Sequence, residues 1–518
     1  MAKQPHPDSM EFAGDYNLNN ILLVNHEAKE KTGIVDIKRM AMELNIYESI
    51  FNNAVTGTMV ITDAQNVIAK LPLQGTERLM FKISTPGTKD ITTIVDASEE
   101  TGHPFHVYKI TDKKQISEGT LLYTIHFCSR EFLRNARTRV SQAYTGTMDD
   151  IAAAIFKDKA YLDSRKRFNF EPTRNTAKLT IPNMRPFDAI MMCADKALPK
   201  NTKGAGYYFY ETTKGYHFRS WENMIATQGN FPRTIAAVFD YMIRNVDKKH
   251  PTLPIGGGKD KHTQDMSAVR NYDFVNNYDT LAQQAMGTYA HRVITHNIYD
   301  KSYDIKKYNY HAHYADHQHA DLNSAENYPI MDVPVDFEQK SISEYDESMV
   351  TLQPTTQYSH NKITGPEGTD VKDAGHTEAT RVTQANSVGN GIQLHLEVSG
   401  HSWLQAGDVI FFQLRTVEPD KGGSGRGTTY DSRYAGRYVI THLRHRVIEE
   451  EYTQSLDCVK DSTYKKYDDP RKSFPPEHYG RPGGSSGWNT QPELINIYDR
   501  DKAEIRASEF ADSTGGQF

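Results

Sequence analysis

The stretch LNIYESIFNNAVTGTMVITDAQNVIAKLPLQGTERLMFKISTPG, residues 44–87, contains two short runs of β-forming residues separated by turn residues. The runs 58–62 (TMVIT) and 79–83 (LMFKI) are rich in Thr, Val, Ile and Phe, which suit a half-buried pleated surface. Gly75 precedes the second run and Pro86 with its following glycine ends it. This stretch therefore predicts antiparallel β structure.

The same pattern continues on both sides of this stretch. Further runs occur at 21–24 (ILLV), 105–110 (FHVYKI) and 121–127 (LLYTIHF), and Gly102 and Gly119 supply breaks between strands. We therefore predict an N-terminal β-barrel or sandwich domain over residues 1–130.

The hydrophobic period changes after this domain. Within 130–144, Leu133, Ala136, Val140 and Ala143 recur three and four residues apart, as on one face of a helix. Further helices are predicted over 149–162 and 186–198. The runs 207–212 (YYFYET) and 216–221 (YHFRSW) predict two strands. Residues 131–225 are therefore predicted to form an α+β domain.

The C-terminal half is less uniform. Residues 226–385 have a weak pattern, and we assign them to a middle insertion domain. The run IQLHLEV, 392–398, alternates apolar and polar residues and predicts a half-buried strand, so residues 386–465 are assigned to a second β domain. Residues 466–518 are rich in Pro and Gly and are predicted to form an extended tail.

The composition excludes several classes of protein. The net charge of −6 gives no general basic surface for gripping nucleic acid. The cysteines Cys128, Cys193 and Cys458 are too few and too far apart for a disulfide framework or a CxxC zinc site, which fits a reducing cytoplasm. The N-terminus has no signal-peptide core, and no run of 18 apolar residues occurs, so we expect no membrane span.

Motifs of known catalytic chemistry are missing. The glycine-rich stretches 256–259 (GGGK) and 422–427 (GGSGRG) do not match a phosphate-binding loop. The sequence contains neither GxSxG nor HExxH. We therefore predict a protein that is not an enzyme and that needs no cofactor.

One segment could still bind a metal. Residues 311–319 (HAHYADHQH) hold four histidines, and on a strand all four would project to the same side. The neighbouring Asp316 and Asp321 are not specially placed. We favour a polar interface strand or loop over a metal site. A metal site would take one of two forms, a structural metal on the axis of a symmetric oligomer or a catalytic metal. The four candidate ligands are His311, His313, His317 and His319.

Residues 44–87 resemble the opening tube domain of bacteriophage baseplate hub proteins, which join the tail tube to the central spike and are related to late-control tail proteins. The resemblance covers about 44–462, although the histidine-rich segment and the loop 416–433 depart from it. It continues at 129–146, 181–197, 206–224, 276–304, 404–414, 434–447 and 452–462.

The resemblance implies two β-barrel-like tube domains with inserted α+β domains. Three chains would form a ring whose six barrels match the sixfold tube while the whole stays threefold for the spike. Its implied partners are further copies of the chain, the tail tube protein, the central spike protein, baseplate wedge proteins and DNA in transit. The expected location is the virion tail baseplate, after assembly in the host cytoplasm.

Two other functions stay open from the sequence. One is a metal-dependent cell-wall hydrolase of a phage tail that uses the four histidines. The other is the same kind of hub in a bacterial contractile injection system.

Overall fold

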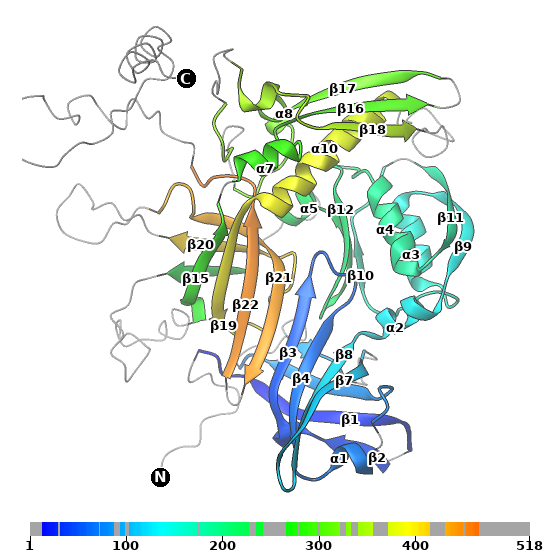
Figure 1. Ribbon diagram of the computed structural model, residues 1–518, viewed down its shortest axis with the longest axis vertical. Coiled ribbons are helices and arrows are strands. Elements are labelled where there is room, and N and C mark those ends of the chain that lie inside the picture. Colours follow the sequence, from blue (N-terminus) through cyan, green and yellow to red (C-terminus); the bar gives the residue numbers. More distant parts are fainter. Residues whose placement is uncertain are drawn as a thin grey trace, which may run out of the picture.

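The structure is a computed structural model, and its strands form four sheets in the part of the chain that it describes (Figure 1). The described residues are 13–29, 32–71, 73–86, 94–98, 103–174, 176–226, 235–241, 266–277, 279–297, 301–321, 328–332, 340–355, 371–414, 430–448 and 451–465. The predicted tail 466–518 and the stretches 256–259 and 422–427 lie outside them.

Eight strands near the N-terminus form one end of the largest sheet, and we call them the N-terminal β unit. Its apolar core includes Ile46, Met59, Phe81 and Phe127, which are all buried. The short helices η1 (Lys38–Met40) and α1 (Val67–Lys70) lie between its strands. The strands are β1 (Asn17–Lys29), β2 (Thr32–Asp36), β3 (Ala41–Ser49), β4 (Thr56–Asp63), β5 (Arg78–Ser84), β6 (Val95–Asp96), β7 (Phe105–Ser117) and β8 (Thr120–Cys128).

Six strands form the other end of this sheet, and we call them the C-terminal β unit. Its pairings run from β15 through β19, β22, β21 and β20 to β14, and a bridge between Asp240 and Ala268 leads back toward β15. The predicted strand at 392–398 is confirmed, with alternate residues buried. The strands are β14 (Ala237–Tyr241), β15 (Val269–Asn276), β19 (Ile392–Ser399), β20 (Val409–Leu414), β21 (Gly436–Ile448) and β22 (Glu451–Lys460).

Two strands of this unit come from the stretch 226–385, which the sequence analysis assigned to a middle domain. β14 pairs with β20 in parallel, and β15 pairs with β19 antiparallel. Both partners lie more than a hundred residues further along the chain, so local sequence patterns do not reveal the pairings. The structure therefore places β14 and β15 in the C-terminal β unit.

The two β units share one unbroken sheet. β21 pairs antiparallel with β3, in register from His442 opposite Ser49 to Ile448 opposite Glu43. In Figure 1 these are the orange and blue strands at the centre of the molecule. We call this pairing the seam.

The segment after β8 packs beside the N-terminal β unit. Its helices α3 and α4 confirm two of the predicted helices, and their buried faces share a core with Phe209 and Phe218. Strands β12 and β13 match the two predicted runs. The elements are α2 (Arg130–Arg137), β9 (Val140–Gly146), α3 (Met148–Lys157), β10 (Phe168–Phe170), β11 (Ala177–Met184), α4 (Pro186–Lys196), β12 (Tyr207–Thr212), β13 (Gly215–Ser220) and α5 (Trp221–Ile225).

The predicted helix over 130–144 is wrong in its second half. Helix α2 ends at Arg137, and the chain continues as β9, in which Val140 is buried and pairs with Met184 of β11. The tertiary pairing with β11 therefore decides the conformation of a stretch whose apolar spacing also fits a helix.

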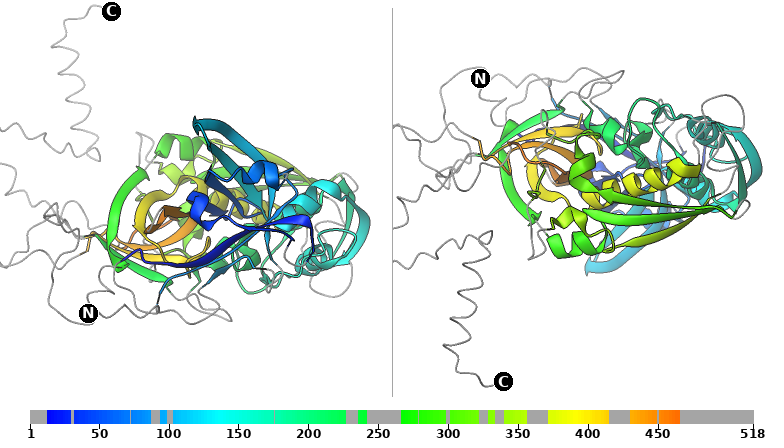
Figure 2. Two further views of the ribbon diagram at one scale, coloured as in Figure 1. Left: turned by 90° about the horizontal axis from the view of Figure 1, so that it is seen from below. Right: turned by 90° about the horizontal axis from the view of Figure 1, so that it is seen from above.

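A third unit lies above the others in Figure 1, and we call it the upper unit. Its sheet has the order β17–β16–β18, and helix α10 lies along these strands (Figure 2). Buried Val293, Tyr308 and Ala379 belong to the core between them. The elements are α7 (Thr280–Ala285), β16 (Ala290–Asn297), β17 (Tyr303–Asn309), α8 (Tyr310–Tyr314), η3 (Ile342–Glu344), β18 (Val350–Thr355) and α10 (Val371–Asn390).

Three cysteines are unpaired and buried, at positions 128, 193 and 458. Burial raises the pKa of the thiols of Cys128 and Cys193 to about 12. Among the described helices, none combines the length and the apolar character that crossing a membrane requires.

A buried histidine makes the C-terminal β unit sensitive to acid. Burial lowers the pKa of His401 to about 4, from an ordinary value of 6.5. Between these values the unfolded chain takes up a proton that the folded chain does not, so stability falls as the pH falls through this window. At about 1.4 kcal/mol for each pH unit, the loss is on the order of 3 kcal/mol.

We expect His401→Asn to reduce this loss between pH 6.5 and 4, measured by denaturant unfolding at a series of pH values. The asparagine amide can still donate to the Ser399 carbonyl, which lies 2.6 Å from His401 Nδ1. A variant that keeps the full pH dependence would show that other groups cause it, such as His106, whose pKa burial also lowers to about 4.

Candidate functional site: a histidine junction and a polar sheet face

The histidine-rich segment begins as a short helix. α8 spans Tyr310–Tyr314, and the Asn309 side chain caps it by accepting a hydrogen bond from the Ala312 amide at 2.9 Å. The strand that would place all four histidines on one side is therefore absent from 310–314, and the four imidazoles reach different partners.

The first two histidines have local partners. His311 Nε2 lies 2.9 Å from the Ile330 carbonyl, and its Nδ1 lies 3.4 Å from Asp332. His313 Nδ1 lies 3.3 Å from Asp316, whose other carboxylate oxygen binds Lys203 Nζ at 2.7 Å.

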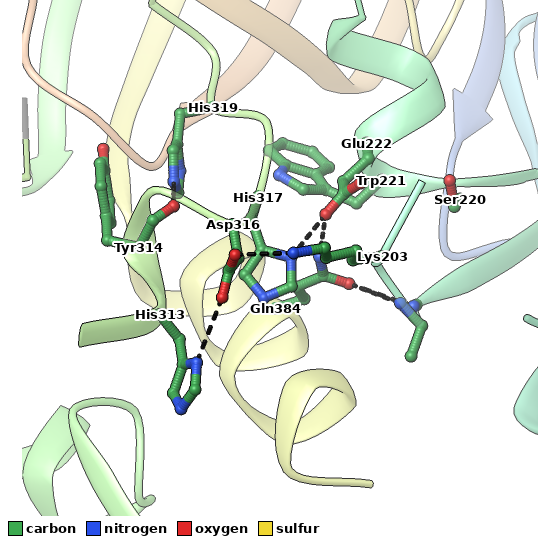
Figure 3. A network of polar contacts seen from close by, with 12 residues as sticks. Lys203, Ser220, Trp221, Glu222, His313, Tyr314, Asp316, His317, His319 and Gln384 are labelled. Atoms are coloured by element: carbon green, nitrogen blue, oxygen red, sulfur yellow. Dashed lines mark hydrogen bonds and ion pairs between the residues drawn. The ribbon is translucent and has the colours of Figure 1, made fainter. Parts of the chain in front are cut away.

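The third histidine reaches the α+β segment. His317 Nδ1 lies 2.8 Å from Oε1 of Glu222, which is on α5 and only 1% exposed (Figure 3). The same oxygen accepts a hydrogen bond from Gln384 Nε2 of α10 at 3.0 Å. The Gln384 carbonyl in turn accepts from the Ala205 amide at 3.1 Å. This contact therefore ties the upper unit to the segment that carries α5.

The fourth histidine reaches the C-terminal β unit. His319 stacks on Tyr314 with ring centroids 3.5 Å apart, and its Nδ1 lies 3.0 Å from Asp461, which follows β22. Burial disfavours the Asp461 carboxylate, but the charge of His319 and hydrogen bonds from His319, the Ala320 amide and Trp221 outweigh it and lower the pKa of Asp461. Asp461 therefore stays ionised in a buried position.

Asp321 follows the four histidines in the sequence and, like His319, contacts the C-terminal β unit. Its carboxylate accepts hydrogen bonds from the Arg437 amide at 2.8 Å and from Lys460 Nζ at 3.2 Å. Burial raises the pKa of Asp321 and lowers that of Lys460, so burial acts against both charges of this pair. We call residues 311–321 and these partners the histidine junction.

The junction lacks the arrangement of a metal centre. Within the described residues, no group of three or more His, Cys, Asp or Glu side chains is placed to hold a metal ion. Instead, single imidazoles face separate carboxylates. Hydrogen bonds between imidazoles and carboxylates therefore join three parts of the chain: the upper unit, the segment that carries α5 and the C-terminal β unit.

A second polar feature lies on the shared sheet. Arg444 and Arg446 of β21 reach across the seam to Glu43 of β3, and their guanidinium groups lie 3.2 and 3.0 Å from the same carboxylate oxygen. Arg444 Nε also donates to Asn45 at 2.9 Å. Burial disfavours ionised Glu43, but hydrogen bonds from Asn45 and Arg446 and the two arginine charges lower its pKa.

The neighbouring strands continue this pattern. Asp457 of β22 lies 2.6 Å from Nδ1 of His395 and 3.9 Å from that of His442. Register places Glu397, Ser455, Arg444 and Tyr47 in one row across β19, β22, β21 and β3. We call this surface the polar sheet face, and acidic groups lie beside its cations.

The opposite side of the seam holds a buried carboxylate. Glu48 of β3 is 2% exposed, and its oxygens accept hydrogen bonds from the amides of Thr213 at 2.7 Å and Ala406 at 2.9 Å. His445 of β21 lies 3.7 Å away. Glu48 therefore joins the N-terminal β unit, the β12–β13 turn and the C-terminal β unit.

Spacing along the sequence gives no signal for Glu222, Asp461, Glu43 or Glu48, because partners that define their roles lie far away in the chain.

The chain is similar in structure to phage tail proteins at low sequence identity. No protein-family model and no curated protein matches the sequence.

The tail protein from Neisseria meningitidis MC58 aligns with a TM-score of 0.46 and 10% identity, over 86% of this chain and 97% of that one. The 43 kDa tail protein of prophage MuSo2 from Shewanella oneidensis gives 0.46 and 8%, over 86% and 98%. The E. coli c3393 protein, a component of the type VI secretion system, gives 0.37 and 9%, over 83% and 76%.

Proposed function

We propose that this chain is a structural baseplate hub that joins a sixfold tail tube to a threefold spike. The observation that carries the proposal is the seam, because it joins two β units with separate cores into one sheet. In a ring of three chains, two barrel-like units in each chain would give six positions around the centre.

Ring formation also suits the edges of the shared sheet. Its pairing order ends at β2 on one side, whereas on the other side the bridge between Asp240 and Ala268 links β14 back toward the last strand, β15. Exposed edge strands are prone to pair with other chains, and assembly into a closed ring can cover such edges. The upper unit would then face outward, toward wedge proteins or the spike.

The polar sheet face is the surface that we assign to the channel. DNA phosphates bind tightly where lysine and arginine are free to contact them, which would hinder passage. Arg444 and Arg446 instead share the carboxylate of Glu43, which offsets one of their two charges. A lining in which carboxylates occupy the arginine groups would let a polyanion pass without being held.

Measurement of mass and shape tests the proposal. We expect the purified chain to form a species of three copies by light scattering, with a central hole and threefold symmetry in electron micrographs. A chain that stays monomeric at every concentration and never joins a tail particle would end the proposal. Imaging of the native particle distinguishes a virion from a bacterial injection machine.

The hydrolase alternative has a direct test. Elemental analysis and a peptidoglycan-release assay should show neither bound zinc nor activity. Zinc at one equivalent per chain, together with release that His317→Ala abolishes, would favour the enzyme over the hub.

Removing the carboxylate of Glu43 should change how the ring interacts with DNA. In Glu43→Gln, Arg444 and Arg446 lose their counter-charge and become available to phosphates. We expect a measurable affinity for duplex DNA whose salt dependence is steeper by about two phosphate contacts. Fluorescence anisotropy at several salt concentrations measures this slope.

Glu397→Gln is the matched control. Glu397 belongs to the same row as Arg444 but two strands away, so its removal changes the net charge equally and leaves the arginine pair intact. Equal DNA binding by the two variants would mean that net charge alone, and not the release of the arginines, is responsible.

A further inference from the structure

The sheet of the upper unit exposes apolar side chains on the face that points away from α10. Ile294 of β16 pairs with Ile305 of β17 on one side and with Leu352 of β18 on the other, so the three form a row. Leu352 is 67% exposed. Tyr303 and Val350 are exposed on the same face, and we call Tyr303, Ile305, Val350 and Leu352 the sheet patch.

Helix α7 carries a second exposed apolar group. Leu281, which is 80% exposed, and Ala285 lie four residues apart and share one side of the helix, followed by exposed Met286. α7 is held against the end of α10, because Gln283 donates to the Asn390 carbonyl and Asn386 donates to that of Met286. We call Leu281, Ala285 and Met286 the helix patch.

Charges of opposite sign lie next to the two patches along the chain. Exposed Lys301 lies two residues before Tyr303 of the sheet patch, where Lys307 and Arg292 are held by Asp346 at 3.2 and 2.8 Å. Exposed Asp279 lies two residues before Leu281 of the helix patch. Complementary charge around apolar contacts favours one relative orientation of two surfaces.

We infer that the sheet patch of one copy of this chain binds the helix patch of the next copy. Large exposed apolar surfaces on soluble proteins mark interfaces. A contact between two different patches on identical chains is heterologous, and it generates a closed ring when the rotation between copies is one third of a turn. The inference rests on the proposed trimeric hub and names the surfaces through which its copies meet outside the shared sheets.

Mixed disulfides test the contact directly. The protein with Leu281→Cys and the protein with Leu352→Cys are each purified, mixed, allowed to exchange subunits and oxidised. The three native cysteines are buried and give a low background. We expect a covalent dimer from the mixture and little from either variant alone, and we expect the double variant to yield a covalent trimer on non-reducing gels.

The outcomes separate this inference from the proposed function. Trimers without mixed disulfides would overturn the inference and leave the hub intact. Disulfides within one single variant would indicate a symmetric contact and would also overturn it. Chains that remain monomeric would overturn both.

Charge insertion provides a second readout that does not depend on cysteine geometry. Leu352→Asp and Leu281→Asp should each raise the concentration at which trimers dissociate by about tenfold or more. Ile116→Asp, at an exposed position of β7, is the control and should leave it unchanged. Unchanged trimers in both patch variants, with circular dichroism showing folded protein, would contradict the contact.

Discussion

Replacing Glu48 by alanine is expected to lower the free energy of unfolding by about 3–5 kcal/mol, the range seen when one member of a buried charged network is removed. The amides of Thr213 and Ala406 lose their acceptor, and His445 loses the carboxylate beside it. Buried donors without partners are costly because water cannot replace the acceptor. Denaturant unfolding, followed by circular dichroism, measures the change.

The pH dependence of this effect has a defined sign. Burial acts against the charge of Glu48, but His445 and the two backbone hydrogen bonds outweigh it, so its pKa lies below the ordinary value of 4.5. A carboxylate with a lowered pKa contributes stability above the pKa of the unfolded chain, and this contribution disappears as the pH falls through the folded value. The stability that Glu48→Ala loses relative to the wild type should therefore be largest at neutral pH and smaller in acid.

The exposed Glu397 supplies the comparison for Glu48. Glu397→Ala should change stability by less than about 0.5 kcal/mol, because its side chain remains in water in the folded protein. A similar cost for both variants would mean that the contacts of Glu48 do not hold the three parts together.

Replacing His317 by alanine is the second substitution with a large expected effect. Glu222 is left buried with Gln384 as its remaining side-chain partner at Oε1, and depriving a buried polar group of a hydrogen-bond partner costs about 1–3 kcal/mol, or more where the group is charged. We expect the upper unit to become easier to detach, seen as faster amide hydrogen exchange across 310–321 and α10. The N-terminal β unit should exchange at its wild-type rate.

His313→Ala is the internal control for this experiment. His313 belongs to the same segment, but it and its partner Asp316 are 34% and 42% exposed. Exposed ion pairs contribute about 0–1 kcal/mol. Equal effects of the two substitutions would show that the segment, and not the buried pair, holds the upper unit. Adding Glu222→Gln to His317→Ala should recover part of the loss, since the buried charge is then gone.

The sequence was sufficient where local patterns decide the structure. The alternation at 392–398 predicts β19 because burial on one face imposes a period of two. After Pro186, buried apolar residues recur three and four positions apart, and this spacing predicts α4 because it places them on one face of a helix. Asn309 also carried a usable signal, because asparagine is a common helix cap and its side chain caps α8.

The remainder depends on distant parts of the chain. Val140 fits a helical spacing, but its pairing with Met184 makes it part of a strand. The four histidines left a shared metal open as the less favoured alternative because they lie close in sequence, whereas the carboxylates that bind two of them, Glu222 and Asp461, lie about a hundred residues or more away. Such partners cannot be read from spacing along one sequence.

The order in which the chain is made gives the seam a consequence for synthesis. β3 leaves the ribosome early, but β21 follows roughly 400 residues later, which takes about 20–80 seconds at ordinary translation rates. Throughout that interval the nascent chain presents an unpaired strand edge that can template aggregation. Production of this protein should therefore respond strongly to chaperones that shield growing polypeptides, and slower elongation between codons 50 and 436 should lower the soluble yield.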